Sequence, residues 1–176
     1  MDEKVIYFAK KDIYDKIKKA NGTWNDSKDR PIVCLIESKE QKGLYWAIPM
    51  GNWNHRDEVA KKRIEKYLNC PDNDIRSCYY HLGRTTVKSI FFISDVIPIT
   101  DYYIDKPYMG FDNKAYIIKN KTLLDELECK LTRILTMENG KNNCFRQRIT
   151  DVKNELIMEL EQQTALAEVA VGKVED

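Results

Sequence analysis

The residues best suited to chemistry are concentrated in the stretch 51–56, which reads GNWNHR. The imidazole of His55 titrates near neutral pH, so it can accept or donate a proton in the cell. The guanidinium of Arg56 can hold a phosphate through two parallel hydrogen bonds. Together the two side chains suit phosphoryl chemistry, in which one group moves a proton and another holds charge. A histidine here could equally cap the helix that follows or stack on Trp53.

The other residues with chemical potential do not form a metal or disulfide pattern. Five cysteines are scattered along the chain, with no CxxC pair and no histidine at ligand spacing, so no disulfide framework, metal site or cofactor is expected. They are Cys34, Cys70, Cys78, Cys129 and Cys144. Cys34 lies inside the apolar run PIVCLI and is expected to be a buried thiol. The second histidine, His81, is expected to be a half-buried strand residue that is hydrogen-bonded to a neighbour.

The elements on either side of residues 51–56 decide where these side chains point. LYWAIPM (44–50) has the aromatic and branched content of a strand. Pro49 has no amide hydrogen for a β-ladder, and Gly51 permits backbone angles that other residues resist, so we expect the strand to stop at Pro49 and the chain to turn. DEVAKKRIEKYLN (57–69) begins with acidic residues and is expected to form a helix. The unpaired N–H groups at its start would favour a nearby anion.

Hydrophobic periodicity predicts strands and helices along the rest of the chain. Strands are expected over 5–9, 31–38, 75–82, 87–100 and 115–119, and the polar link KEQKG predicts an antiparallel hairpin of 31–38 with 44–50. Helices are expected over 10–20, from Lys121 to a stop signal at Asn139-Gly140, and from near Phe145 onward. The fold class is therefore α+β: an antiparallel, partly barrel-like β-sheet with packed helices and a helical C-terminal part.

Length and hydropathy limit the protein classes that the chain can belong to. With 176 residues, of which 43% are hydrophobic, the chain is expected to form one domain over 1–162, followed by a flexible acidic tail over 163–176. No window approaches the ~20 apolar residues that span a bilayer, and the first residues lack the apolar stretch of a secretory signal. A cytoplasmic protein with no membrane partner is therefore expected.

The net charge of +1 is the sum of a basic segment and an acidic segment of the chain. Residues 151–176 carry seven acidic and two basic side chains, so this segment has a charge of −5 and residues 1–150 have a charge of +6. Basic clusters over 10–19, 61–66 and 141–148 could contact a polyanion, or they could be solvated helix faces.

Three stretches, in their order and spacing, carry a resemblance to a known family. They are SKDRPIVCLIES (27–38), YWAIPMGNWNHR (45–56) and TVKSIFFISDVIPI (86–99). With them, the chain resembles the toxins of type III toxin–antitoxin systems, which are the ToxN/AbiQ/CptN-like bacterial endoribonucleases. The likeness is greatest to the CptN-type branch, and it covers roughly residues 1–160.

The resemblance implies a function and a partner. It implies an antiparallel sheet related to other small ribonuclease toxins, metal-independent RNA cleavage in a groove at the end of the strand YWAIPM, and a role such as phage defence in the bacterial cytoplasm. It also implies inhibition by a small RNA antitoxin of pseudoknot repeats, held in closed assemblies in which toxin and RNA alternate. In ToxN-like members the turn after this strand carries hydroxyls and a lysine, whereas here Gly51, Asn52 and His55 take those places. The basic residue before the earlier strand corresponds to Lys28 or Arg30, and the lysine of the later strand corresponds to Lys88.

The residues and the resemblance together predict catalytic roles. Metal-independent RNA cleavage needs a base for the 2'-hydroxyl, an acid for the leaving 5'-oxygen, and donors around the phosphate. The products would be a 2',3'-cyclic phosphate and a 5'-hydroxyl. The predicted catalytic residues are His55 as general base or acid, Asn52 as a phosphate donor, Arg30 as the electrostatic clamp with Arg56 as its alternative, and Lys88. The second proton-transfer group stays open among Tyr14, Tyr45, Thr85, Thr86, Lys88 and Ser89.

Basic residues interleaved with aromatic ones are expected to bind RNA by phosphate contacts and base stacking. The predicted RNA-binding residues are Lys10, Lys11, Tyr14, Lys28, Tyr45, Gly51, Trp53, Arg56, Lys61, Lys62, Arg84, Thr85 and Ser89, and Trp24 offers a further stacking face. The alternative function is a non-catalytic RNA-binding or interaction module. In that case the two C-terminal helices form the interaction face and His55 is structural.

Overall fold

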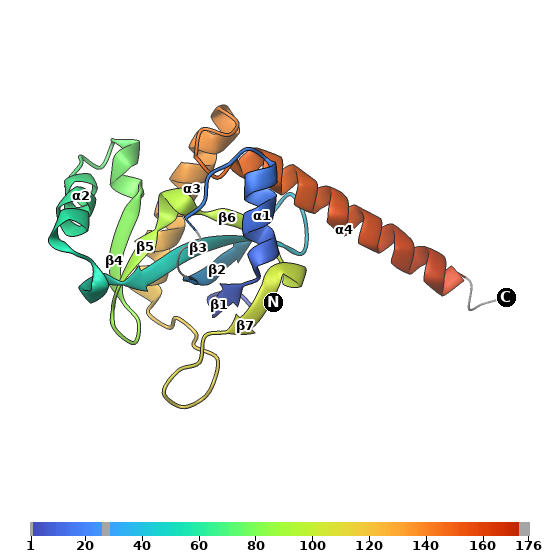
Figure 1. The fold of residues 1–176 in the computed structure, drawn as a ribbon, viewed down its shortest axis with the longest axis horizontal. Coiled ribbons are helices and arrows are strands. Elements are labelled where there is room, and N and C mark those ends of the chain that lie inside the picture. The colour runs from blue at the N-terminus through green and yellow to red at the C-terminus, as the bar shows by residue number, and fades with distance from the viewer. Residues whose placement is uncertain (1, 26–28, 173–176) are drawn as a thin grey trace.

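The fold is an antiparallel sheet with helices packed on both of its faces (Figure 1). The structure is a computed structural model that describes residues 2–25 and 29–172. Seven strands form the sheet in the order β4-β5-β3-β2-β1-β7, with β6 paired to β3, and all pairings are antiparallel. The strands are β1 (Ile6–Ala9), β2 (Pro31–Glu37), β3 (Leu44–Asn52), β4 (Tyr80–Arg84), β5 (Lys88–Phe92), β6 (Ile97–Thr100) and β7 (Ile104–Pro107). The α+β class is confirmed, but the sheet stays open and is not closed into a barrel.

Strand β3 is the centre of the sheet and is longer than predicted. It forms the expected hairpin with β2, with Val33 opposite Ile48. Along its other edge it pairs first with β6, over Leu44–Ala47, and then with β5, over Met50–Asn52. The prediction that the strand stops at Pro49 is wrong. Pro49 lies in the short interval between these two pairings, where a missing amide hydrogen interrupts neither of them.

Other predicted strands are divided or absent. Residues 75–78 form a 3₁₀ turn, η2 (Ile75–Cys78), before β4 begins. The segment 87–100 is split into β5 and β6 by η3 (Ile93–Asp95). Strand β5 pairs with both β4 and the end of β3, and β6 continues in the same direction along the first half of β3. Within the described chain, residues 115–119 form isolated bridges rather than a strand. The short edge strand β7, which ends in a proline, was not predicted.

Four helices bury three clusters of apolar side chains. They are α1 (Lys11–Lys19), α2 (Glu58–Leu68), α3 (Lys121–Gly140) and α4 (Ile149–Gly172). Helix α3 covers one face of the sheet with a buried stripe that includes Leu127, Leu131 and Ile134. Helices α1 and α4 share the second cluster, and α2 forms the third with residues of β5 and of the turn after β3.

Helix α4 departs from the prediction at both ends. It begins at Ile149, later than expected, and it continues to Gly172, past the predicted domain boundary at residue 162. The C-terminal part of α4 projects away from the body of the molecule (Figure 1). None of the helices in the described residues is long and apolar enough to cross a membrane.

Candidate functional site

The turn after β3 exposes His55 to solvent. Residues 53–55 form a 3₁₀ turn, η1 (Trp53–His55), in which the Asn52 side chain accepts a hydrogen bond from the backbone N–H of Asn54 at 2.8 Å. Trp53 is buried against Ile64 and anchors the turn, whereas His55 is exposed. The Nδ2 of Asn52 lies 3.4 Å from the Nε2 of His55. The predicted turn is therefore present with His55 in it, whereas Asn52 is the last residue of β3.

The alternative that His55 caps the next helix is not what the structure shows. Helix α2 is capped by Asp57, whose carboxylate accepts a hydrogen bond from the N–H of Ala60 at 2.7 Å. The face of Trp53 is taken by a cation, since the Nζ of Lys88 lies 5.6 Å from its ring centroid. The imidazole of His55 therefore stays exposed to solvent.

Gly51 makes room for Arg56. The backbone of Gly51 is not in the left-handed region, so the predicted reason for a glycine here, unusual backbone angles, is wrong. A Cβ at this position would lie 2.6 Å from the Nη2 of Arg56. Since side chains alternate along a strand, Gly51 shares the α2 side of the sheet with its partner Ile90, and Asn52 shares the other side with Ser89.

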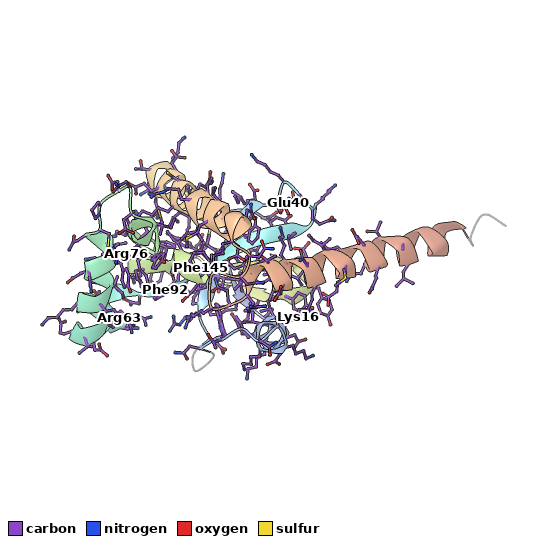
Figure 2. All side chains as sticks on the ribbon, turned by 90° about the horizontal axis from the view of Figure 1, so that it is seen from above. Lys16, Glu40, Arg63, Arg76, Phe92 and Phe145 are labelled. Atoms are coloured by element: carbon purple, nitrogen blue, oxygen red, sulfur yellow. The ribbon has the colours of Figure 1, made fainter. Side chains whose placement is uncertain are left out.

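Beside Arg56 lies a cavity of about 440 Å³, which we call the arginine cavity. It lies between α2, the adjacent ends of β4 and β5, the residue before β2, and the loop between α3 and α4. Figure 2 shows Arg63 and Phe92 among the side chains between α2 and the sheet. Its lining residues include Arg30, Arg56, Arg63, Arg146, Asp95, Tyr67, Tyr79, Tyr80 and Phe92.

The arginine cavity is strongly positive. The guanidinium carbons of Arg30 and Arg56 lie 4.9 Å and 5.4 Å from the ring centroid of Phe92. The Nε atoms of both arginines are buried without a hydrogen-bond partner in the described part of the chain. Burial lowers the pKa of Arg30, and the neighbouring charge of Arg56 lowers it further. Arg146 is neutralised by Asp95, with its Nη2 2.8 Å from Oδ2.

Tyrosine rings form the apolar wall of the arginine cavity. The ring of Tyr67 lies 5.5 Å from that of Tyr79 and 5.7 Å from that of Tyr80, and Tyr80 meets Phe92 edge to face. Burial raises the pKa of Tyr79 and of Tyr80, so both phenols stay protonated at neutral pH and can donate hydrogen bonds.

Five further predicted residues lie on the β4–β5 hairpin next to the turn, namely Arg84, Thr85, Thr86, Lys88 and Ser89. Lys88 is exposed and lies over Trp53. The hydroxyls of Thr85 and Ser89 are 2.8 Å apart, and Ser89 is fully buried. Ser89 therefore holds the hairpin in shape and cannot contact RNA directly. Thr86, one of the candidates for the second proton transfer, is half-buried in the same hairpin.

Other predicted residues lie outside this site. Lys10 and Lys11 line a separate cleft at the start of α1, where Lys10 donates to the backbone carbonyl of Tyr102 at 2.5 Å. Tyr14 is buried and stacks on Trp24 with ring centroids 4.9 Å apart, so Trp24 is not a free stacking face. Burial raises the pKa of Tyr14 to about 12, which makes it a poor proton donor at neutral pH.

The remaining predicted residues are divided between other surfaces. Tyr45 is half-buried on the stretch of β3 that pairs with β6, away from the turn, and burial raises its pKa. On α2, Lys61 forms an ion pair with Glu58 at 2.8 Å and Lys62 is exposed. Arg84 lines a different cavity, formed with residues 112 and 114–120. Lys28 lies outside the described residues.

Sequence reasoning missed most of the arginine cavity. Arg63 and Arg146 lie in the basic clusters 61–66 and 141–148, but nothing in the sequence shows that their side chains meet. Tyr67, Tyr80 and Phe92 appear there only as apolar positions of a helix and two strands. Their convergence with Arg30 depends on tertiary structure.

No protein-family model matches the chain, and a search of the curated proteins finds no significant match. Among the described residues, no group of three or more histidine, cysteine, aspartate or glutamate side chains is placed to hold a metal ion.

Proposed function

We propose that this protein is a metal-independent endoribonuclease that acts as the toxin of a type III toxin–antitoxin system. The observation that supports it best is the exposed imidazole of His55, which lies 3.4 Å from the Asn52 amide and directly precedes Arg56 of the arginine cavity. A group suited to proton transfer is thus the chain neighbour of one of the arginines that line the cavity. RNA cleavage by its own 2'-hydroxyl requires this combination.

In the proposed mechanism the nucleophile belongs to the RNA. His55 takes the proton of the 2'-hydroxyl, or it gives one to the 5'-oxygen, as the 2'-oxygen attacks phosphorus and the bond from phosphorus to the 5'-oxygen breaks. A 2',3'-cyclic phosphate and a 5'-hydroxyl result. The Asn52 amide and the guanidinium of Arg56 stabilise the negative charge that develops on the phosphate oxygens. The guanidinium of Arg30 adds a second positive charge. When the Asn52 amide donates to Nε2, the imidazole carries its proton on Nδ1.

The proposed inhibitor is a small RNA of pseudoknot repeats. Its support is the same surface, since unneutralised arginines next to tyrosine rings suit the phosphates and unpaired bases of a folded RNA. Toxin and RNA would then alternate in a closed assembly. Short tandem nucleotide repeats just upstream of the reading frame would identify this RNA, and their absence would count against the proposal.

Cleavage of labelled single-stranded RNA in the presence of a chelator tests the enzyme proposal. Cleavage that survives chelation is expected for the wild-type protein. His55→Ala should slow it by ~100- to 10,000-fold, the usual contribution of one acid–base group, and should leave RNA binding nearly unchanged. Asn52→Ala should cost ~100- to 1,000-fold, as expected for the loss of one preorganised donor.

The second histidine provides a matched control. His81 lies between β4 and α3, so His81→Gln should cleave at the wild-type rate. If the His55→Ala protein cleaved as fast as the wild type, the assignment of His55 would be wrong. If the wild-type protein bound RNA and left it intact, the chain would instead be a non-catalytic RNA-binding module.

A further inference from the structure

The arginine cavity holds more positive charge than the protein itself neutralises. Four arginines line it against one aspartate. In the described residues, Arg146 is the one member of the four with an ion pair. Arg30, Arg56 and Arg63 therefore offer their charge to a ligand. Arg30 and Arg56 are half-buried, and like charges of this kind are costly unless an anion joins them.

The shape and walls of the cavity suit a flat ring next to that anion. A volume of about 440 Å³ lies within the usual range for small-molecule sites. Tyr67, Tyr79, Tyr80 and Phe92 supply aromatic surface. No other described residue hydrogen-bonds the phenol hydroxyls of the three tyrosines, so these hydroxyls are free to contact the edge of a base.

We propose that the arginine cavity binds one unstacked nucleotide of an RNA strand. Its phosphate lies among Arg30, Arg56 and Arg63, and its base packs against the rings of Tyr67 and Tyr80. The inference rests on the proposed function, since it names the part of the substrate that is held beside the cleavage turn. A base that is paired and stacked in a duplex cannot enter such a cavity, so the site selects single-stranded or looped RNA.

Gly51 links the cavity to the turn. The Nη2 of Arg56 lies against the face of Gly51, and the next residue of β3 is Asn52. Because Arg56 directly follows His55 in the chain, a phosphate held by Arg56 would belong to a nucleotide close to the linkage at His55. The cavity would set the register of the strand, as a positioning site for the nucleotide next to the scissile bond.

Binding of small probes that cannot be cleaved tests this site separately from catalysis. The probes are the four nucleoside 5'-monophosphates, ribose 5-phosphate and inorganic phosphate, titrated calorimetrically into the full-length protein. At least one nucleotide should bind more tightly than ribose 5-phosphate. Tyr80→Leu should weaken nucleotide binding by about 5- to 150-fold, the range expected for one stacked base, and should leave ribose 5-phosphate binding unchanged.

The arginine variants test the phosphate half of the site. Arg56→Gln and the exposed Arg63→Gln should each weaken nucleotide and ribose 5-phosphate binding alike, and Arg63→Gln removes no buried group. Arg76→Gln is the matched control, because Arg76 pairs with Asp74 at 2.6 Å outside the cavity. Thermal unfolding of each variant confirms that it is folded.

The possible outcomes separate the two proposals. Ribose 5-phosphate that binds as tightly as every nucleotide would overturn the base subsite, and nucleotide binding that survives in both arginine variants would overturn the phosphate subsite. RNA cleavage without any nucleotide binding would refute the proposed nucleotide site but not the proposed enzyme. Nucleotide binding by a protein that never cleaves RNA would refute the proposed enzyme and leave the cavity intact.

Discussion

The imidazole of His81 experiences a different environment from that of His55. It is largely buried, with Nε2 3.1 Å from the Glu126 carboxylate, and burial followed by the charge of Lys130 lowers its pKa below the ordinary 6.5 despite that carboxylate. The folded state therefore binds fewer protons at this site than the unfolded state. This difference in protonation makes a contribution to the free energy of unfolding that is fully present above pH 6.5 and is lost as the pH falls through the lowered pKa of His81.

We therefore expect the free energy of unfolding to fall between pH 7.5 and pH 5.5, and to fall less in His81→Gln. Urea unfolding at both pH values measures this difference. His55→Gln, which removes an exposed imidazole, is the control variant. Equal pH dependence in His81→Gln and the wild type would show that His81 is not responsible.

A second residue-scale prediction concerns Glu138, a buried carboxylate at the end of α3. It accepts hydrogen bonds from the N–H groups of Asn143, Cys144 and Thr150, so it ties the loop after α3 to the start of α4. Glu138→Ala would leave these donors without their acceptor and should lower the free energy of unfolding by about 3 kcal/mol. Chemical denaturation measures the loss, and the exposed Glu161→Ala should stay within about 0.5 kcal/mol of the wild type.

At the scale of elements, the close packing of β3 against the turn gives Gly51 its role. Gly51→Ala places a methyl group where the Nη2 of Arg56 now lies, at 2.6 Å, and the flexible arginine side chain can move away. We expect weaker RNA binding with almost unchanged stability. In Gly22→Ala the new methyl would meet the backbone carbonyl of Ile17 at 2.8 Å, which cannot move as easily. That variant should lose stability and keep its RNA affinity once folded.

Two measurements separate these effects. Thermal unfolding reports stability, and fluorescence anisotropy with an uncleavable 2'-O-methyl RNA reports affinity. A Gly51→Ala protein with wild-type affinity would mean that Arg56 does not need its present place to bind RNA.

Local patterns predicted the elements whose partners are near in sequence. The hairpin of β2 and β3, and helices α1 to α3, follow from periodicity, caps and a short polar link, which are properties of consecutive residues. The extension of β3 past Pro49 and the division of 87–100 did not follow. Both depend on which strand lies alongside, and a single sequence does not show that.

The residues of the candidate site also differ in whether the sequence could predict that they meet. Asn52 and His55 are three residues apart, so their proximity at 3.4 Å could be predicted from a turn. Arg30, Arg63 and Arg146 come from three distant segments, and only the packing of α2 and the α3–α4 loop around the ends of the strands brings them together. The prediction that Ser89 binds RNA was wrong for a related reason, because the burial of Ser89 depends on the strands on both sides of it.

At the scale of the whole molecule, charge is separated in space as well as in sequence. The acidic helix α4 is held to the body by Lys16, whose Nζ lies 3.0 Å from Glu155 and 2.7 Å from Glu159. The hydroxyl of Tyr103 also donates to Glu159, at 2.8 Å. Figure 1 shows α2, which borders the arginine cavity, and the free end of α4 at opposite ends of the molecule. We therefore expect a polyanion to be attracted to the end that carries the cavity and the turn.

This separation leads to a prediction about salt. For single strands, each phosphate contact contributes about 0.7 to the slope of log affinity against log salt concentration, because neutralised phosphates release their counterions. Since the cavity is proposed to hold one phosphate, the combined Arg30→Gln, Arg56→Gln and Arg63→Gln protein should lose roughly 0.7 from this slope relative to the wild type. Anisotropy titrations of 2'-O-methyl RNA over a series of salt concentrations measure both slopes.

The control for the salt experiment is a variant with the same loss of charge on another surface. Arg76→Gln combined with Lys106→Gln and Lys121→Gln removes three cations that pair with aspartates outside the cavity. If net charge alone attracted the RNA, both triple variants would lose the same slope. A loss confined to the cavity variant would mean that the phosphates bind at these arginines, since counterion release counts the phosphates that are neutralised at the site of contact.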